Sequence, residues 1–188
     1  MPNGRAGEAT TIEILLKDAL GNPAADRASA IALSVVGANS IGSLNATDRG
    51  GGRYTASYTP QATGTDQVTI LVSGAGLSGS PFSSQVVPGS TSAAQSFAVV
   101  PARVSIFAPF TITITALDQF GNEVGHGGDP FELRIDDGAP RTVTDNGDGT
   151  YSVAIAAFSL SVATHQVFVS LAGTPIKGSP YSMEVTFF

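Results

Sequence analysis

Hydrophobic and polar residues alternate over short segments along the whole chain. The clearest segments carry apolar residues at every second position: Ile12, Ile14 and Leu16; Tyr54, Ala56 and Tyr58; Val68, Ile70 and Val72; Ile112, Ile114 and Ala116; Tyr151, Val153 and Ile155; and Val167, Val169 and Leu171. A period of two is typical of a β-strand with one face packed inward and the other in water. Because turn residues separate the segments and no helical period occurs, the pattern predicts antiparallel β-sandwiches.

Three motifs occur twice, in the same order, about 100 residues apart. They are Asp18–Asn22 and Asp118–Asn122, Asp48–Tyr54 and Asp145–Tyr151, and Leu77–Phe82 and Ile176–Tyr181. Each motif lies between alternating segments, where a turn is expected. The repeat therefore predicts two tandem domains, each with its own hydrophobic core.

The stretch Pro-Gly-Ser-Thr-Ser-Ala-Ala at residues 88–94 has the small, polar composition of a linker. We predict a first domain over residues 1–88, a linker over 89–94 and a second domain over 95–188. The second domain then opens with a strand that contains Phe97, Val99 and Val100 and ends at Pro101. Only six residues precede Gly7, so we expect the first domain to lack this strand and to leave a sheet edge uncovered. We also expect the chain to be a segment of a longer protein.

The motifs resemble the filamin repeat. The resemblance is strongest at Asp145–Tyr151 and Ile176–Tyr181, and weaker at Asp48–Tyr54, where Arg49 and Arg53 replace two residues of the family pattern. It implies two seven-stranded immunoglobulin-like sandwiches that act as spacers, force-bearing rods and docking sites for partner peptides.

In this family an extended peptide docks at strand C and the groove towards strand D, a mode in which unpaired backbone groups supply affinity. By resemblance, strand D corresponds to residues 43–47 and 141–144. The resemblance places the docking positions of strand C at Ala30, Ile31, Ala32, Leu33, Ser34 and Val35 in the first domain and at Phe131, Leu133 and Ile135 in the second. The first edge carries no charge, whereas Glu132, Arg134, Asp136 and Asp137 surround the second. An ordinary strand, paired within its own sheet or against a neighbouring repeat, is the alternative interpretation.

Charge and composition exclude several function classes. The net charge of −6 and the dispersed arginines argue against nucleic acid and anionic lipid as partners. The absence of cysteine excludes disulfides, thiolate metal sites and cysteine nucleophiles. No apolar run suggests a signal peptide or a membrane span. We expect no enzymatic activity, no cofactor and no small-molecule substrate, and no Gly-x-Ser-x-Gly motif offers a serine nucleophile.

The motif Asp145–Gly149 carries two acidic residues and resembles a calcium loop, but its register is wrong for calcium, since Gly147, Gly149 and Ala156 occupy ligand positions. We interpret it as a tight turn that needs glycine at positive φ. The predicted structural turn residues are Gly21, Gly121, Asp145, Gly147, Asp148 and Gly149. Neither histidine has metal-ligand spacing: His126 is interpreted as a loop residue and His165 as a solvent-facing residue at a strand start.

The sequence thus favours a structural and protein-binding module of a longer filamin-like protein, which docks extended peptides by strand addition. The absence of cysteine slightly favours the cytoplasm, and the resemblance to filamin repeats implies a cytoskeletal role there. The alternative is a cell-surface or gamete-type adhesion ectodomain, for which the low lysine and high serine and threonine content is suitable. Asn45 begins an N-glycosylation sequon, and glycan occupancy there would separate the two hypotheses.

Overall fold

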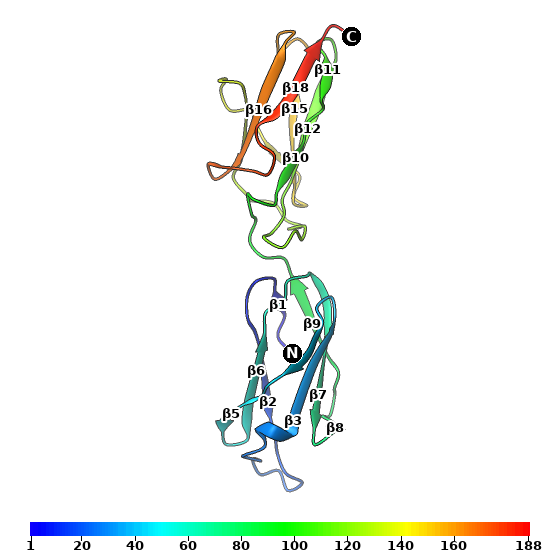
Figure 1. The fold of residues 1–188 in the computed structure, drawn as a ribbon, viewed down its shortest axis with the longest axis vertical. Coiled ribbons are helices and arrows are strands. Elements are labelled where there is room, and N and C mark those ends of the chain that lie inside the picture. Colours follow the sequence, from blue (N-terminus) through cyan, green and yellow to red (C-terminus); the bar gives the residue numbers. More distant parts are fainter. The chain divides into compact units, whose positions relative to one another are not determined.

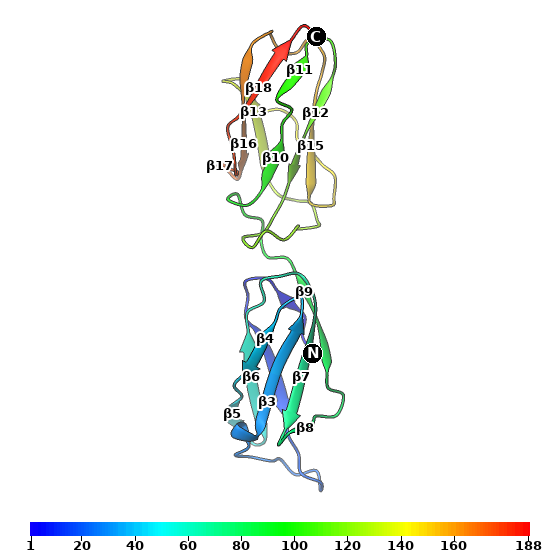
Figure 2. The same cartoon turned by 45° about the vertical axis from the view of Figure 1, so that its right-hand side comes forward.

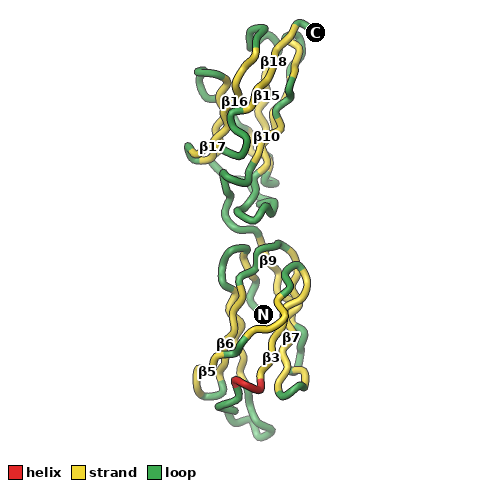
Figure 3. Tube along the Cα trace, viewed as in Figure 1, coloured by secondary structure: helices red, strands yellow, loops and turns green.

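The computed structural model describes residues 1–188 and divides them into two compact domains, Met1–Gly89 and Ser90–Phe188. Each domain consists of two layers of strands (Figures 1 and 2). The regular structure is strand apart from one 3-10 turn, η1 at Ala28–Ala30 (Figure 3). The predicted all-β fold of two tandem immunoglobulin-like sandwiches is confirmed.

One sheet of the first domain has the order β1-β9-β7-β3-β4, with β8 paired to β7, and the other has the order β2-β6-β5. All pairs are antiparallel except β1 with β9. The strands are β1 Gly4–Arg5, β2 Thr10–Leu15, β3 Ile31–Gly37, β4 Ile41–Leu44, β5 Thr47–Gly50, β6 Arg53–Tyr58, β7 Gly64–Val72, β8 Ala75–Gly76 and β9 Phe82–Val87.

The second domain repeats this plan with two differences: it has the strand β10, and it has no strand in the place of β4. Its sheets have the orders β10-β12-β15-β14 and β11-β18-β16-β13, with β17 paired to β16. The strands are β10 Phe97–Val99, β11 Arg103–Ser105, β12 Phe110–Thr115, β13 Phe131–Ile135, β14 Thr144–Asp145, β15 Thr150–Ile155, β16 Thr164–Leu171, β17 Thr174–Pro175 and β18 Tyr181–Thr186.

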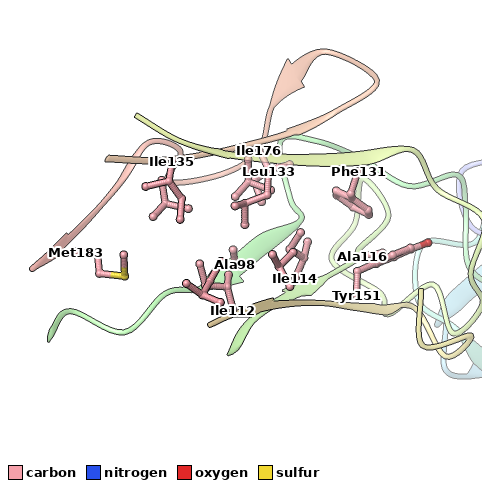
Figure 4. Packing of buried hydrophobic residues seen from close by; sticks show 14 of the residues in the cluster. Ala98, Ile112, Ile114, Ala116, Phe131, Leu133, Ile135, Tyr151, Ile176 and Met183 are labelled. Carbon is pink, nitrogen blue, oxygen red and sulfur yellow. The ribbon is translucent and has the colours of Figure 1, made fainter. Parts of the chain in front are cut away.

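A separate hydrophobic core lies between the two sheets of each domain. Figure 4 shows the core of the second domain, where Ile112 and Ile114 of one sheet face Leu133 and Ile135 of the other. The alternating residues predicted to point inward do so: Val35, Tyr54, Val68, Ile112, Ile114 and Val167 are completely buried. Each such aliphatic side chain contributes about 1.5–3 kcal/mol through removal from water, so the two cores account for the folding of two independent sandwiches.

The additional strand of the second domain is β10, which pairs with β12. In the first domain the strand equivalent to β12 is β2. It pairs only with β6 and forms the edge of its sheet. Residues 1–188 therefore hold no counterpart of β10, and the expected lack of an opening strand in the first domain is confirmed. Pairing of Gly4–Arg5 with β9 corresponds instead to the pairing of β11 with β18.

Residues 90–94, predicted as part of the linker, pack on the second domain. The backbone N–H of Ser92 donates to the Leu117 carbonyl at 2.8 Å, and the Thr91 hydroxyl donates to the Asp129 carboxylate at 2.8 Å. Small polar residues have the composition of a linker, but these have hydrogen-bond partners close by in the loops before and after residue 120.

Candidate functional site

The predicted docking strand of the first domain, β3, lies inside its sheet. It pairs with β7 along one side and with β4 at Leu33 and Val35 along the other. The side chains of Ile31, Leu33 and Val35 are buried in the core, whereas Ala32 is exposed and Ser34 is half-buried. Ala30 precedes the strand, because its N–H closes the η1 turn on the Arg27 carbonyl.

The predicted docking strand of the second domain, β13, forms the edge of its sheet and pairs with β16 only. The loop after the strand covers part of this edge: Arg141 N–H donates to the Leu133 carbonyl at 2.8 Å, and Gly138 N–H donates to the Ile135 carbonyl at 3.1 Å. The side chains of Phe131, Leu133 and Ile135 are buried. A docked peptide would therefore contact backbone, and it would have to displace the loop.

Strand D differs from the expected ranges in both domains. In the first domain residues 43–47 leave one sheet and enter the other, because β4 pairs with β3 while β5 pairs with β6. In the second domain residues 141–144 contribute an isolated bridge at Arg141 and then the short β14. The more open of the two predicted edges is thus β13, although its sequence carries more charge.

The predicted turn residues lie at the ends of strands, where they form local hydrogen bonds. Asp18 accepts backbone bonds from Leu20 and Asn22, and Asp118 accepts the equivalent bonds in the second domain. The glycines of these turns have left-handed φ angles: Gly21 at 87°, Gly121 at 85°, Gly147 at 80° and Gly149 at 83°.

The carboxylates of the Asp145–Gly149 turn bind the protein's own backbone. Asp145 accepts N–H bonds from Gly128 at 2.7 Å and Gly147 at 2.8 Å, and Asp148 accepts both the N–H and the hydroxyl of Thr150. The bonds from Thr150 hold the pKa of Asp148 below its usual value. No cluster of three or more acidic, histidine or cysteine side chains suited to a metal ion occurs in the chain.

His165 was expected to face solvent, and this prediction is wrong. The residue is only 6% exposed, and its ring lies among polar groups. Nδ1 lies 2.6 Å from the Asp136 carboxylate, and Nε2 lies 2.9 Å from the Ser161 carbonyl. Both partners are acceptors, so both ring nitrogens must donate and the imidazolium form is favoured. Burial opposes this charge, but the bonds to Ser161 and Asp136 outweigh it and raise the pKa of His165.

The alternation along β16 contained the signal for this burial, because residue 165 shares a face with Val167 and Val169. The equivalent residue of the first domain, Asp66, is also completely buried. It accepts bonds from the backbone N–H of Asn39 at 2.7 Å and from the Tyr58 hydroxyl at 3.0 Å. One position of the repeat thus carries a buried polar group that holds the loop after strand C in each domain.

A tyrosine in each domain joins the strand after the Asp48 or Asp145 turn to the loop before strand C. The Tyr54 hydroxyl donates to the Ala24 carbonyl and accepts the N–H of Arg27. Tyr151 pairs with Asp129 in the same way, at 2.9 Å to its N–H and 3.1 Å to its carboxylate. Burial raises the pKa of Tyr151 to about 12, and the charge of Asp129 adds to this rise. These residues are structural, and they offer no nucleophile or general base.

The comparisons with known proteins agree with this architecture. The family described as invasin, domain 3, matches residues 91–188, and the filamin/ABP280 repeat matches residues 1–83. The chain belongs to the invasin domain 3 family. The predicted resemblance to filamin repeats is confirmed by the match over the first domain.

Solved structures of bacterial proteins share the fold over nearly the whole chain. The Escherichia coli adhesin FdeC is 24% identical with a TM-score of 0.67, and 98% of this chain aligns with 61% of that chain. InvD of Yersinia pseudotuberculosis is 24% identical with a TM-score of 0.56, over 98% of this chain and 54% of that one. Invasin, a bacterial integrin-binding protein, is 21% identical with a TM-score of 0.62, over 95% and 36%.

The chain thus spans 61% or less of the length of these three structures. At such identities the likeness concerns the fold. No helix of the chain has the length and hydrophobicity that a membrane span requires.

Proposed function

We propose that this chain is a protein-binding segment of a bacterial surface adhesin, in which tandem immunoglobulin-like domains mediate contact with other proteins. The observation that carries the proposal is the alignment of both domains together, over 98% of the chain, with the adhesin FdeC. The match to invasin domain 3 supports the same class of protein. The proposal takes up the surface-adhesion alternative from the sequence in place of a cytoskeletal scaffold.

An extracellular location is part of this proposal. The likeness to FdeC and InvD supports it. The few lysines and the many exposed threonine and serine side chains are compatible with it. The side chain of Asn45 is exposed between β4 and β5, so the sequon is accessible. The cytoplasmic preference drawn from the absence of cysteine has no support among these relatives.

Docking of an extended peptide at strand C is the finer part of the proposal, and β13 is the better candidate edge. An Arg141→Pro variant removes the N–H that occupies the Leu133 carbonyl, and it leaves the core residues of β13 in place. We expect this variant to bind a β13-docking partner more tightly than the original chain. Unchanged or weaker binding by a folded Arg141→Pro chain would argue against docking at β13.

The test of the proposed function is binding of the purified 188-residue chain, labelled with a fluorophore, to intact animal cells. We expect saturable binding that an excess of unlabelled chain displaces. The control is a Val153→Asp chain, whose second domain has a charge in its core. Binding that does not saturate, or that is as strong for the Val153→Asp chain and for a chain unfolded in both domains as for the original chain, would contradict an adhesive role.

A further inference from the structure

The first domain has an unpaired sheet edge at which one more strand could bind, and the second domain shows the strand that occupies the equivalent edge. In the second domain β10 lies antiparallel to β12, with Phe97 opposite Thr115, Ala98 opposite Ile114 and Val99 opposite Thr113. The strand equivalent to β12 is β2, since Ile12 and Ile14 take the core positions of Ile112 and Ile114. No strand of residues 1–188 lies on the free side of β2.

The strand β10 is held by both sheets of its domain. Its N–H at Ala98 donates to the Tyr181 hydroxyl at 2.9 Å, and Lys177 N–H donates to the Ser96 carbonyl at 3.1 Å. Ala98 is 7% exposed, whereas its neighbours Phe97 and Val99 point outward and are 38% and 60% exposed. The position beside β12 therefore accommodates a strand with a small, buried side chain at its centre and larger, exposed side chains on either side.

The same place in the first domain is an apolar groove of about 430 Å³. Its lining includes Leu77 and Phe82, which correspond to Ile176 and Tyr181 of the second domain. Ile176 is buried at 3% exposure, but Leu77 is only partly buried. Leu15, at the end of β2, is 52% exposed. Apolar surface that the second domain buries around β10 is thus left accessible in the first.

The backbone of β2 is also left without partners on this side. Leu16 N–H donates to the Gly52 carbonyl, so the even-numbered residues of β2 direct their backbone groups towards β6. Thr11, Glu13 and Leu15 direct theirs the other way, to the free edge. Three consecutive pairing positions beside an apolar groove form the arrangement that an added strand requires.

We propose that the groove along β2 is a strand-acceptor site, which binds an extended, uncharged strand from a polypeptide outside residues 1–188, antiparallel to β2. The chemistry of the occupant follows from β10: residues 95–100, Gln-Ser-Phe-Ala-Val-Val, carry no charge and place alanine at the centre. The groove is lined mainly by apolar residues, which include Met1 and Pro2, and Glu13 has its one charged side chain. A second copy that paired its own β2 here would bring two Glu13 carboxylates into proximity, which disfavours that occupant.

The probe is a fluorescein-labelled peptide with the sequence of residues 94–101, titrated into the chain and followed by fluorescence anisotropy. We expect saturable one-to-one binding and slower hydrogen exchange at residues 11–15. A peptide with Ala98→Lys should bind at least about tenfold more weakly, because a charge would enter the apolar groove. Absence of saturable binding, or equal binding of the two peptides, would overturn the proposal.

Variants of the chain locate the binding. Glu13→Pro removes one edge N–H and leaves the bonds to β6 intact, so it should weaken the peptide at least about tenfold. Leu77→Lys should do the same through the groove lining and serves as a second variant if Glu13→Pro does not fold. Val36→Lys, on the outer face of β3, is the matched control and should bind normally. Equal binding by folded Leu77→Lys and Val36→Lys chains would place the peptide elsewhere.

A fusion gives an independent measurement. The sequence of residues 94–101, joined ahead of Met1 through a flexible linker, should raise the Tm of the first domain, whereas the Ala98→Lys form of the fusion should not. If sedimentation instead shows that the free chain is a dimer which Leu77→Lys converts to monomer, the occupant is a second copy and the proposal is wrong. None of these results depends on cell binding, so they test the acceptor site separately from the adhesive role.

Discussion

The turn at Gly149 offers a quantitative test of how this repeat closes its sandwich. Gly149 has φ 83°, and a Cβ there would lie 2.7 Å from the Gly125 nitrogen and 3.3 Å from the Gly125 Cα. Gly147 has nearly the same φ, 80°, but a Cβ there would meet nothing within 4 Å. The pair Gly149→Ala and Gly147→Ala therefore separates the cost of the backbone conformation from the cost of the collision.

The conformational cost of a left-handed non-glycine residue is roughly 1–2 kcal/mol. The collision at Gly149 adds about 1–3 kcal/mol, because Gly125 is backbone and must move as a whole. We expect Gly147→Ala to destabilise the second domain by about 1 kcal/mol and Gly149→Ala by about 2–5 kcal/mol. For a domain of this size the corresponding decreases in Tm are about 4–8 °C and at least about 10 °C.

Calorimetry of the whole chain measures both values, and hydrogen exchange of the β15 and β16 amides assigns the change to the second domain. The first domain should unfold as before, since each domain has its own core. If the two variants lower the Tm equally, the close approach of Gly149 to Gly125 contributes nothing and the reasoning is refuted. Gly149→Val should destabilise the second domain more than Gly149→Ala does.

Three further predictions concern buried groups. Val153→Asp, at 1% exposure, should unfold the second domain as seen by circular dichroism, while Ala154→Asp on the exposed neighbouring position should leave it folded. The pKa of His165 is raised in the fold, so its contribution to stability is complete below its unfolded pKa of about 6.5 and is lost as the pH rises through the folded value. The Tm of the second domain should therefore fall over that pH window. A His165→Gln chain should show no such fall. Tyr54→Phe should cost about 1–3 kcal/mol in urea unfolding of the first domain, because the Ala24 carbonyl and the Arg27 N–H lose their partner, and a change below about 0.5 kcal/mol would contradict that role.

The sequence predicted the two cores well because alternation reports directly which side of a strand packs inward. Every second residue from Ile112 to Ala116 and from Tyr151 to Ile155 is buried, as expected. The absent strand of the first domain was predictable too, since a repeat of known period shows what one copy has and the other lacks. The turns at Asp18 and Asp118 were readable from residue type, because aspartate bonds its own backbone two residues on.

The pairing partners of the strands were harder to predict. The resemblance placed a docking edge at β3, but the short strand β4 covers that side of β3. Its sequence, Ile-Gly-Ser-Leu, has no regular alternation that would have predicted a strand there. Residue type favours an exposed His165, whereas its position in the alternation favours burial. Its partner Asp136 lies in a loop 29 residues away, so the sequence does not indicate the ion pair that allows the burial. The charges around β13 suggested that charge prevents pairing at this edge. In the structure the loop at Arg141 covers part of the edge instead.

We propose that these two sandwiches present binding surfaces on the outside of a cell. Flow cytometry of the source cells with an antibody raised against residues 1–188 tests this most directly. We expect intact cells to be labelled and brief protease treatment to remove the label. Labelling that appears only after the cells are permeabilised would contradict it.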